Sequence, residues 1–136
     1  MSHDLQRFVA AQEGIYDQAL AELRNGRKTS HWMWFVFPQI QGLGRSGMAQ
    51  RYAISDLEEA KAYLEHPTLG PRLRECAGAL TQLDETDATR VMGGIDALKL
   101  KSSMTLFNRA AQDDVFQAVL QQYFDGEEDE LTLERL

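Results

Sequence analysis

His31 is the side chain of this protein best suited to acid–base chemistry, because an imidazole changes its charge closer to neutral pH than any other side chain. It precedes residues 32–37, which hold both tryptophans and two of the six phenylalanines of the chain. Gln39 follows a proline, whose ring restricts the backbone. The side-chain amide of Gln39 could bind a ligand or form hydrogen bonds with the backbone of the loop. We consider His31 a candidate general acid or base, with a structural hydrogen bond in a short helix as the alternative.

The two tryptophans are expected to have different surroundings. Trp32 and Trp34 are two residues apart, so on a helix their side chains diverge by about 200°. One ring would pack inward, while the other would line a cleft and stack on a planar ligand or a partner. Packing of both rings in the core is the alternative. Lys28, just before this run, would help to orient an anionic ligand.

A second run of polar residues follows Lys99 in the last third of the chain. Ser102, Ser103 and Thr105 place three hydroxyl groups within four positions, although these residue types are unfavourable inside a helix. One interpretation is close packing of helices against small side chains. The other is that Ser102 or Ser103, together with Lys99, donates hydrogen bonds to an anion held opposite His31.

The charge distribution narrows the class of ligand. The chain has a net charge of −7, yet residues 23–55 and 97–112 contain no Asp or Glu and carry several Lys and Arg. Acidic residues concentrate instead in residues 127–136, which we predict to be a solvated tail unless its leucines dock it. A net negative protein is not suited to duplex nucleic acid, whereas a locally basic surface suits a small anionic metabolite.

Metal and cofactor chemistry are weakly supported, so we predict neither. His3, His31 and His66 lack the spacing of metal ligands, and Cys76 is the only cysteine. Residues 42–47 match G-x-G-x-x-G, but no strand leads into them, so a tight connection is the expected role. A phosphate held by the amides of this loop is the alternative.

The composition predicts a cytoplasmic protein that does not enter a membrane. A lone cysteine fits a reducing compartment, and residues 1–4 show no signal peptide. No apolar run approaches the ~20 residues of a membrane-spanning helix.

The apolar spacing predicts an all-α protein, with a single compact domain over residues 1–126 and an acidic C-terminal tail over residues 127–136. We expect about six to eight helices and no sheet, with a buried strand at 31–37 as a local alternative. The predicted helices cover residues 5–23, 31–37, 46–52, 55–65, 71–83, 96–111 and 113–124, with a short turn from Asp87 to Gly93-Gly94.

Two motifs resemble a bacterial family of unknown function whose members are often labelled "calpastatin". They are the segments from Ser30 to Gln39 (SHWMWFVFPQ) and from Lys99 to Phe107 (KLKSSMTLF). Shorter matches include Arg7-Phe8, Ala11-Gln12, Tyr16, Ala19-Leu20, Gly42-Leu43-Gly44, Tyr52, His66-Pro67 and Leu69-Gly70. The resemblance implies a compact α-helical fold and carries no activity.

The leading hypothesis is a pocket between the His31 segment and the helix containing Lys99–Thr105. It would bind, and if the protein is an enzyme also process, a small anionic, nucleotide-like metabolite. Its ligand-binding residues would be Lys28, Trp32, Trp34, Gln39, Lys99, Ser102 and Ser103, with His31 as the catalytic residue. The alternatives are a non-enzymatic protein–protein interaction module that uses the aromatic segment, and self-association through the same face.

Overall fold

The computed structural model describes residues 4–111 and 113–136, so His3 lies outside the described residues. Within them the protein is a single all-α domain with ten helices and no strand, which confirms the predicted fold class. The helices are α1 (Gln6–Gln12), α2 (Tyr16–Arg24), α3 (Met33–Val36), α4 (Gly47–Arg51), α5 (Leu57–Glu65), α6 (Leu69–Thr81), α7 (Ala88–Met92), α8 (Gly94–Ala111), α9 (Asp114–Phe124) and α10 (Glu130–Leu133).

The described helices outnumber the six to eight predicted, with differences at three places. One is α7, which was predicted as a short turn from Asp87 to Gly93-Gly94. The helix predicted over residues 5–23 is wrong, because Gly14 takes a φ of 74° and separates α1 from α2. Glycine adopts this left-handed backbone without the steric cost of a side chain. The acidic C-terminal residues also form a helix, α10, which the sequence pattern did not predict.

Local capping residues set several helix starts. Ser46 caps α4, since its hydroxyl accepts a hydrogen bond from the Ala49 amide at 3.1 Å. The helix predicted over residues 55–65 is not capped by Ser55. Asp56 instead accepts from the Glu59 amide at 2.8 Å, and the Glu59 carboxylate accepts from the Ser55 amide at 2.7 Å. The Asp56 side chain thus caps α5, while the Glu59 carboxylate binds the amide of the residue before the cap.

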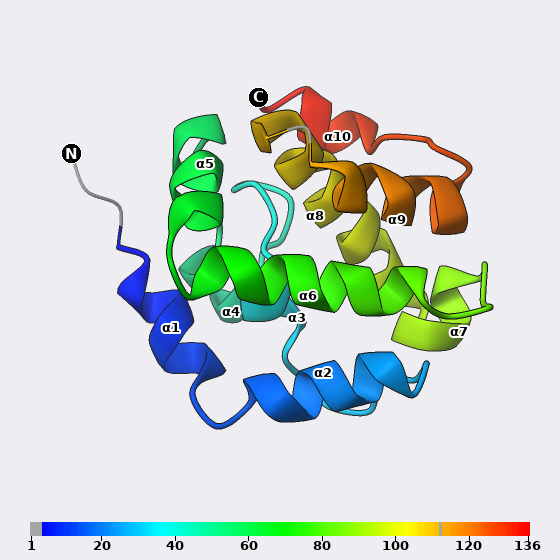
Figure 1. The fold of residues 1–136 in the computed structure, drawn as a ribbon. Helices are drawn as coiled ribbons and strands as arrows, with labels where there is room; N and C mark the ends of the chain where they lie inside the picture. Colours follow the sequence, from blue (N-terminus) through cyan, green and yellow to red (C-terminus); the bar gives the residue numbers. More distant parts are fainter. Residues whose placement is uncertain (1–3, 112) are drawn as a thin grey trace.

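Helix α8 lies at the centre of the fold and packs against α5, α7, α9 and α10 (Figure 1). Helix α6 crosses in front of it, between α2 and α9. Residues 102–107 of α8 are all buried, so this part of the helix is enclosed on every side. This part of α8 therefore has no solvent-facing stripe, unlike an amphipathic surface helix.

A single β-bridge fixes the long connection between α3 and α5. Ile40 and Ile54 form an isolated parallel bridge, with the Ile54 amide donating to the Gln39 carbonyl at 2.8 Å. The Gln41 amide donates to the Ile54 carbonyl, also at 2.8 Å. These bonds hold Gln39 and the following glycine-rich loop beside the first half of α8.

Candidate functional site

A hollow of about 380 Å³ lies where the loop after Gln39, the first half of α8 and α10 meet. We call it the α8 hollow. It brings together Gln39, Lys99 and Ser102, three of the residues predicted from the sequence to bind a ligand. The described residues lining it are Gln39, Leu43, Gly44, Ile95, Leu98, Lys99, Ser102, Asp129 and Leu131.

The rim of the α8 hollow is unusually apolar. Ile95, Leu98 and Leu131 are 74%, 69% and 59% exposed, and they are three of the five large hydrophobic side chains exposed among the described residues. Isolated apolar side chains on a surface are ordinary, whereas several around one concavity are typical of a binding site.

Lys99 supplies the positive charge of the α8 hollow. Its Nζ lies 3.7 Å from Asp96 Oδ1 and 5.2 Å from the centre of the half-buried Trp34 ring. The ring face attracts the ammonium group. Asp96 also holds Lys28, whose Nζ lies 2.9 Å from Asp96 Oδ2. Asp96 therefore neutralises part of the basic charge that the sequence places here.

Lys28, Trp32 and Trp34 are not among the described residues that line the hollow. Trp32 is fully buried, and its Nε1 donates to Glu22 Oε1 at 2.9 Å. The Lys28 ammonium lies 4.9 Å from the centre of the Trp32 ring. The two tryptophans thus diverge as predicted, with Trp32 inside and Trp34 beneath Lys99.

Glu22 holds the segment that leads into α3, a role that was not predicted from the sequence. Its carboxylate accepts from the backbone amides of Thr29 and Ser30 at 2.8 and 3.1 Å, as well as from the Trp32 indole. Burial alone would raise the pKa of Glu22, but hydrogen bonds from Ser30, Thr29, Trp32 and Gln18 outweigh it and lower the pKa to about 2. The available signal was an acid at helical spacing from Ala19, on the buried face of α2.

The hydroxyl run of α8 is divided between two environments. Ser102 Oγ lies 2.8 Å from Thr132 Oγ1, and Thr105 Oγ1 accepts from the Asp129 amide at 2.9 Å. These hydroxyls bind the C-terminal segment. Ser103 is fully buried, and its Oγ is the one buried side-chain polar atom of the described residues without a hydrogen bond. Ser103 does not join Ser102 because successive helical residues point about 100° apart.

His31 is exposed and is not among the described residues that line the α8 hollow. The neighbouring Ser30 hydroxyl donates to Glu22 Oε2 at 2.7 Å, which fixes the backbone just before the imidazole. The structure thus places His31 on a rigid segment outside the hollow.

The glycine-rich loop forms one side of the hollow. Gly42 has a φ of 92°, and a Cβ there would lie 2.4 Å from Nη1 of Arg135. The absent side chain therefore makes room for the guanidinium group of the C-terminal segment. Gly44 lines the hollow directly. Both observations fit the tight connection predicted for this loop.

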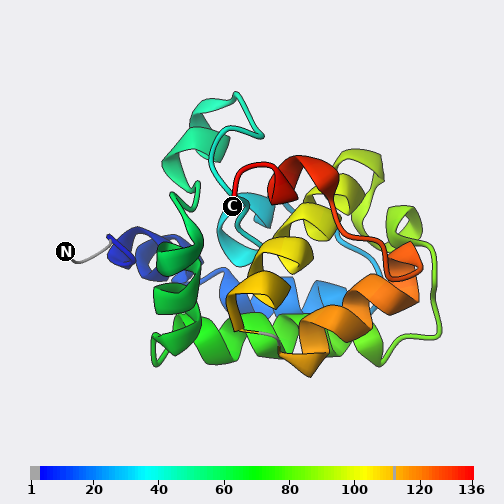
Figure 2. The same cartoon turned by 90° about the horizontal axis from the view of Figure 1, so that it is seen from above.

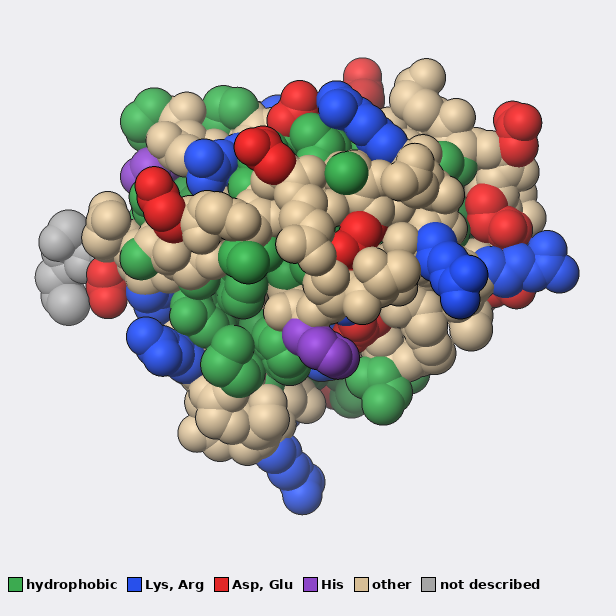
Figure 3. All heavy atoms as spheres, turned by 90° about the horizontal axis from the view of Figure 1, so that it is seen from below, with side chains coloured by type: hydrophobic (Ala, Val, Ile, Leu, Met, Phe, Trp, Pro, Cys, Tyr) green, Lys and Arg blue, Asp and Glu red, His purple; other side chains and the backbone are tan. Residues whose placement is uncertain are grey.

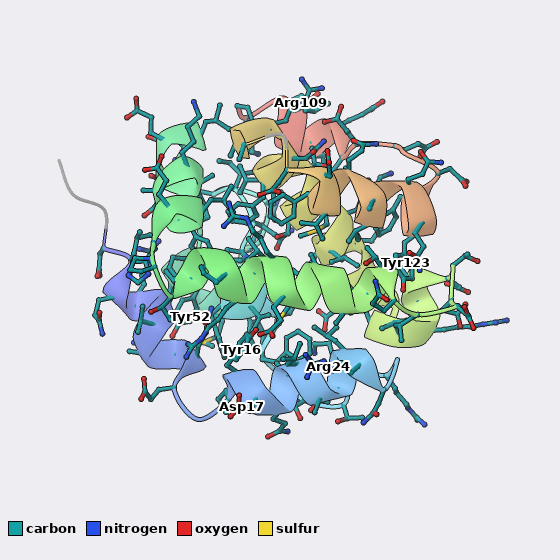
Figure 4. The ribbon with its side chains drawn as sticks, viewed as in Figure 1. Tyr16, Asp17, Arg24, Tyr52, Arg109 and Tyr123 are labelled. Atoms are coloured by element: carbon teal, nitrogen blue, oxygen red, sulfur yellow. The ribbon has the colours of Figure 1, made fainter. Side chains whose placement is uncertain are left out.

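The free thiol lies elsewhere, between α2 and α6. Cys76 is fully buried, and burial raises the pKa of its thiol to about 12. A thiol held neutral in this way is a poor nucleophile. Tyr16 lies in the same region, with its hydroxyl donating to the Glu75 carboxylate (Figure 4).

Residues 4–111 and 113–136 contain no group of three or more His, Cys, Asp or Glu side chains that could hold a metal ion. No helix in this part of the chain is long and apolar enough to cross a membrane.

Comparison with known proteins identifies the family. Residues 2–136 match the model described as protein of unknown function (DUF1810). The chain belongs to this family. It is also similar to a crystal structure of the conserved hypothetical protein Rv1873 from Mycobacterium tuberculosis, with 53% identity and a TM-score of 0.96. The match covers 98% of this chain and 96% of that one. No curated protein matches the chain.

The family description confirms the predicted membership in a family of unknown function. It carries no calpastatin label, and that label contributes nothing to the function proposed below. The strong similarity to a solved structure supports the all-α fold.

Proposed function

We propose that this DUF1810 protein binds a small metabolite with an apolar body and an anionic group in the α8 hollow. The observation that carries the proposal is the clustering of Ile95, Leu98 and Leu131 around Lys99 in one concavity. Covering their apolar surface with a ligand is favourable by about 25 cal/mol per Å². A nucleotide-like ligand fits this description when its base covers the apolar rim.

Lys99 and Gln39 are the groups proposed to orient the ligand. An ammonium group has three donors, so Lys99 can contact Asp96 and an anion together. The Gln39 side chain offers both a donor and an acceptor. Because the lining is mostly apolar and Asp96 offsets the charge of Lys99, we expect the apolar body to supply much of the affinity.

Thermal-shift measurements against nucleotides, phosphorylated metabolites and aromatic carboxylates test this proposal. A ligand at a hundred times its Kd stabilises the folded state by about 2.7 kcal/mol. Lys99→Met keeps an apolar chain over Trp34 but removes the charge, so it is expected to reduce stabilisation by the anionic ligands.

Lys61→Met, on the exposed side of α5, is the matched control and should retain the full shift. Leu98→Ser should weaken binding with little change in stability, since Leu98 is exposed. Shifts that survive both Lys99→Met and Leu98→Ser would contradict the α8 hollow as the site.

A catalytic role for His31 is a separate proposal, because the residue lies outside the hollow. If a ligand found in the screen is chemically converted, His31→Ala is expected to stop conversion while leaving the thermal shift unchanged. Unchanged turnover in His31→Ala would show that the imidazole takes no part in the reaction.

The second candidate function is a non-enzymatic interaction module. Hydrophobic side chains gather between basic side chains on the face seen from below in Figure 3. Most of the aromatic segment is unavailable to a partner, however, since Trp32, Phe35 and Phe37 are buried. Self-association is the simplest form of this candidate, and light scattering of wild type and Leu98→Asp distinguishes it from ligand binding. The cytoplasmic location and the absence of duplex nucleic acid binding stay predictions.

A further inference from the structure

We propose that residues 127–136, which we call the C-terminal strap, move about a hinge at Asp125-Gly126 to open and close the α8 hollow. The proposal rests on the function proposed above, because it assigns the strap the role of admitting the ligand. It also assigns the acidic C-terminal residues a function, the control of access to the hollow, which their composition does not indicate.

The C-terminal strap forms one wall of the hollow. Its residues Asp129 and Leu131 line the cavity opposite the side chains of α8. Beyond α10 the chain reaches the glycine-rich loop, where Arg135 occupies the space left by Gly42. The strap therefore reaches from α8 to that loop, and the view from above shows α10 lying beside α8 (Figure 2).

The attachment of the C-terminal strap to α8 is largely polar. Hydrogen bonds and surface ion pairs contribute modestly to stability, since water replaces the partners when they separate. Salt weakens exposed ion pairs further. The contacts are Lys101–Glu127 at 3.4 Å, Arg109–Glu128 at 2.6 Å, the Asp129 amide to Thr105 at 2.9 Å and Ser102–Thr132 at 2.8 Å.

Little apolar surface opposes the opening of the C-terminal strap. Leu131 and Leu136 are exposed, and Leu133 is half-buried. The one fully buried side chain of α10 is Thr132, which is itself polar. Segments with few buried apolar contacts open more readily than the core of the same protein.

The proposed hinge is the C-cap of α9, where the strap begins. Asp125 takes a left-handed conformation with φ 55° and ψ 28°, and Gly126 has a φ of 79°. These two residues end α9, whose Phe116, Val119 and Leu120 are fully buried. Rotation at Asp125-Gly126 can thus move the strap while α9 stays in the core.

A reversible cross-link tests the movement. The hydroxyl oxygens of Ser102 and Thr132 are 2.8 Å apart, which places their side chains within reach of a disulfide in the double variant Ser102→Cys/Thr132→Cys. The probe is 1-anilinonaphthalene-8-sulfonate, which combines an apolar body with one anionic group. Stopped-flow fluorescence then compares its association rate in the oxidised and reduced forms of the same protein.

We expect the oxidised form to bind the probe at least roughly tenfold more slowly than the reduced form, because the open state is no longer reached. Thr132→Cys alone, treated with the same oxidant, is the control and should show no such change, since Thr132 does not line the hollow. Equal association rates in the fully cross-linked and reduced forms would overturn the strap proposal while leaving the binding function intact.

Native-state hydrogen exchange provides a readout that needs no ligand. The amides of residues 127–136 are expected to exchange faster than those of α8 and α9, and faster still at high salt. Exchange of the strap only together with α8 would overturn the proposal even if the probe does not bind. Absence of probe binding in wild type and in the reduced variant, with rapid strap exchange, would instead count against the proposed function.

Discussion

Replacing Glu22 with alanine is expected to lower the free energy of unfolding by about 3–5 kcal/mol, because buried donors lose their acceptor and cannot reach water. The Trp32 indole and the amides of Thr29 and Ser30 all donate to this carboxylate. The loss is comparable to the whole stability of a marginal domain. Chemical denaturation at pH 7 measures it.

The isosteric variant Glu22→Gln tests the charge through its pH dependence. The pKa of Glu22 falls from its ordinary value of 4.5 to about 2 in the folded protein, so the charged form stabilises the fold. That contribution, about 3 kcal/mol, is complete above pH 4.5 and is lost as the pH falls towards 2. The difference between wild type and Glu22→Gln should therefore shrink over this pH range.

Glu13→Gln is the matched control for the Glu22 variants. Glu13 is exposed between α1 and α2, and we expect its replacement to change stability by less than about 0.5 kcal/mol. A Glu22→Gln variant as stable as Glu13→Gln at every pH would show that the hydrogen bonds of Glu22 contribute nothing. Loss of Glu22 should also loosen the segment that carries Trp34 beneath Lys99.

Gly70→Ala is the second substitution with a large expected effect. A Cβ at Gly70 would lie 2.1 Å from the carbonyl oxygen of Leu64, a backbone atom that cannot rotate away. The junction between α5 and α6 must then open, and α5 carries Tyr63 against Phe107 of α8. We expect destabilisation of about 3 kcal/mol or more, at the upper end of overpacking effects.

Gly78 in the same helix is the control for this prediction. A Cβ there meets no atom within 4 Å, so Gly78→Ala should stabilise the protein by about 0.5–1 kcal/mol through helix propensity. Urea denaturation of the two variants should give effects of opposite sign. If both variants were stabilised, the close approach of Gly70 to Leu64 would be absent in solution.

The periodicity of apolar residues was sufficient to predict most of the helices, because it reflects contacts within a few turns of chain. The helices predicted near α5, α6, α8 and α9 are all present. The helix predicted over residues 113–124 ends where α9 ends, since the backbone angles of its C-cap Asp125 are set locally. The break at Gly14 was missed because the apolar spacing continues across it.

The candidate site was only partly predictable. Residue types and local charge identified Lys99, Gln39 and Ser102, which the fold brings to one hollow. Nothing in those types distinguished Ser102 from Ser103, because the partner of Ser102 is Thr132, thirty residues away. The apolar rim was missed for a related reason. Whether a leucine is exposed or buried depends on the packing of the whole chain, and the residue type alone does not show it.

The sequence by itself determined a helical protein and a segment rich in aromatic and basic residues, both of which depend on neighbours along the chain. Tertiary structure decided that Glu22 holds the aromatic segment and that Asp96 neutralises two lysines. It also decided that the acidic C-terminus lies on α8 beside the hollow. These contacts join residues distant in sequence, and packing of the whole chain selects them.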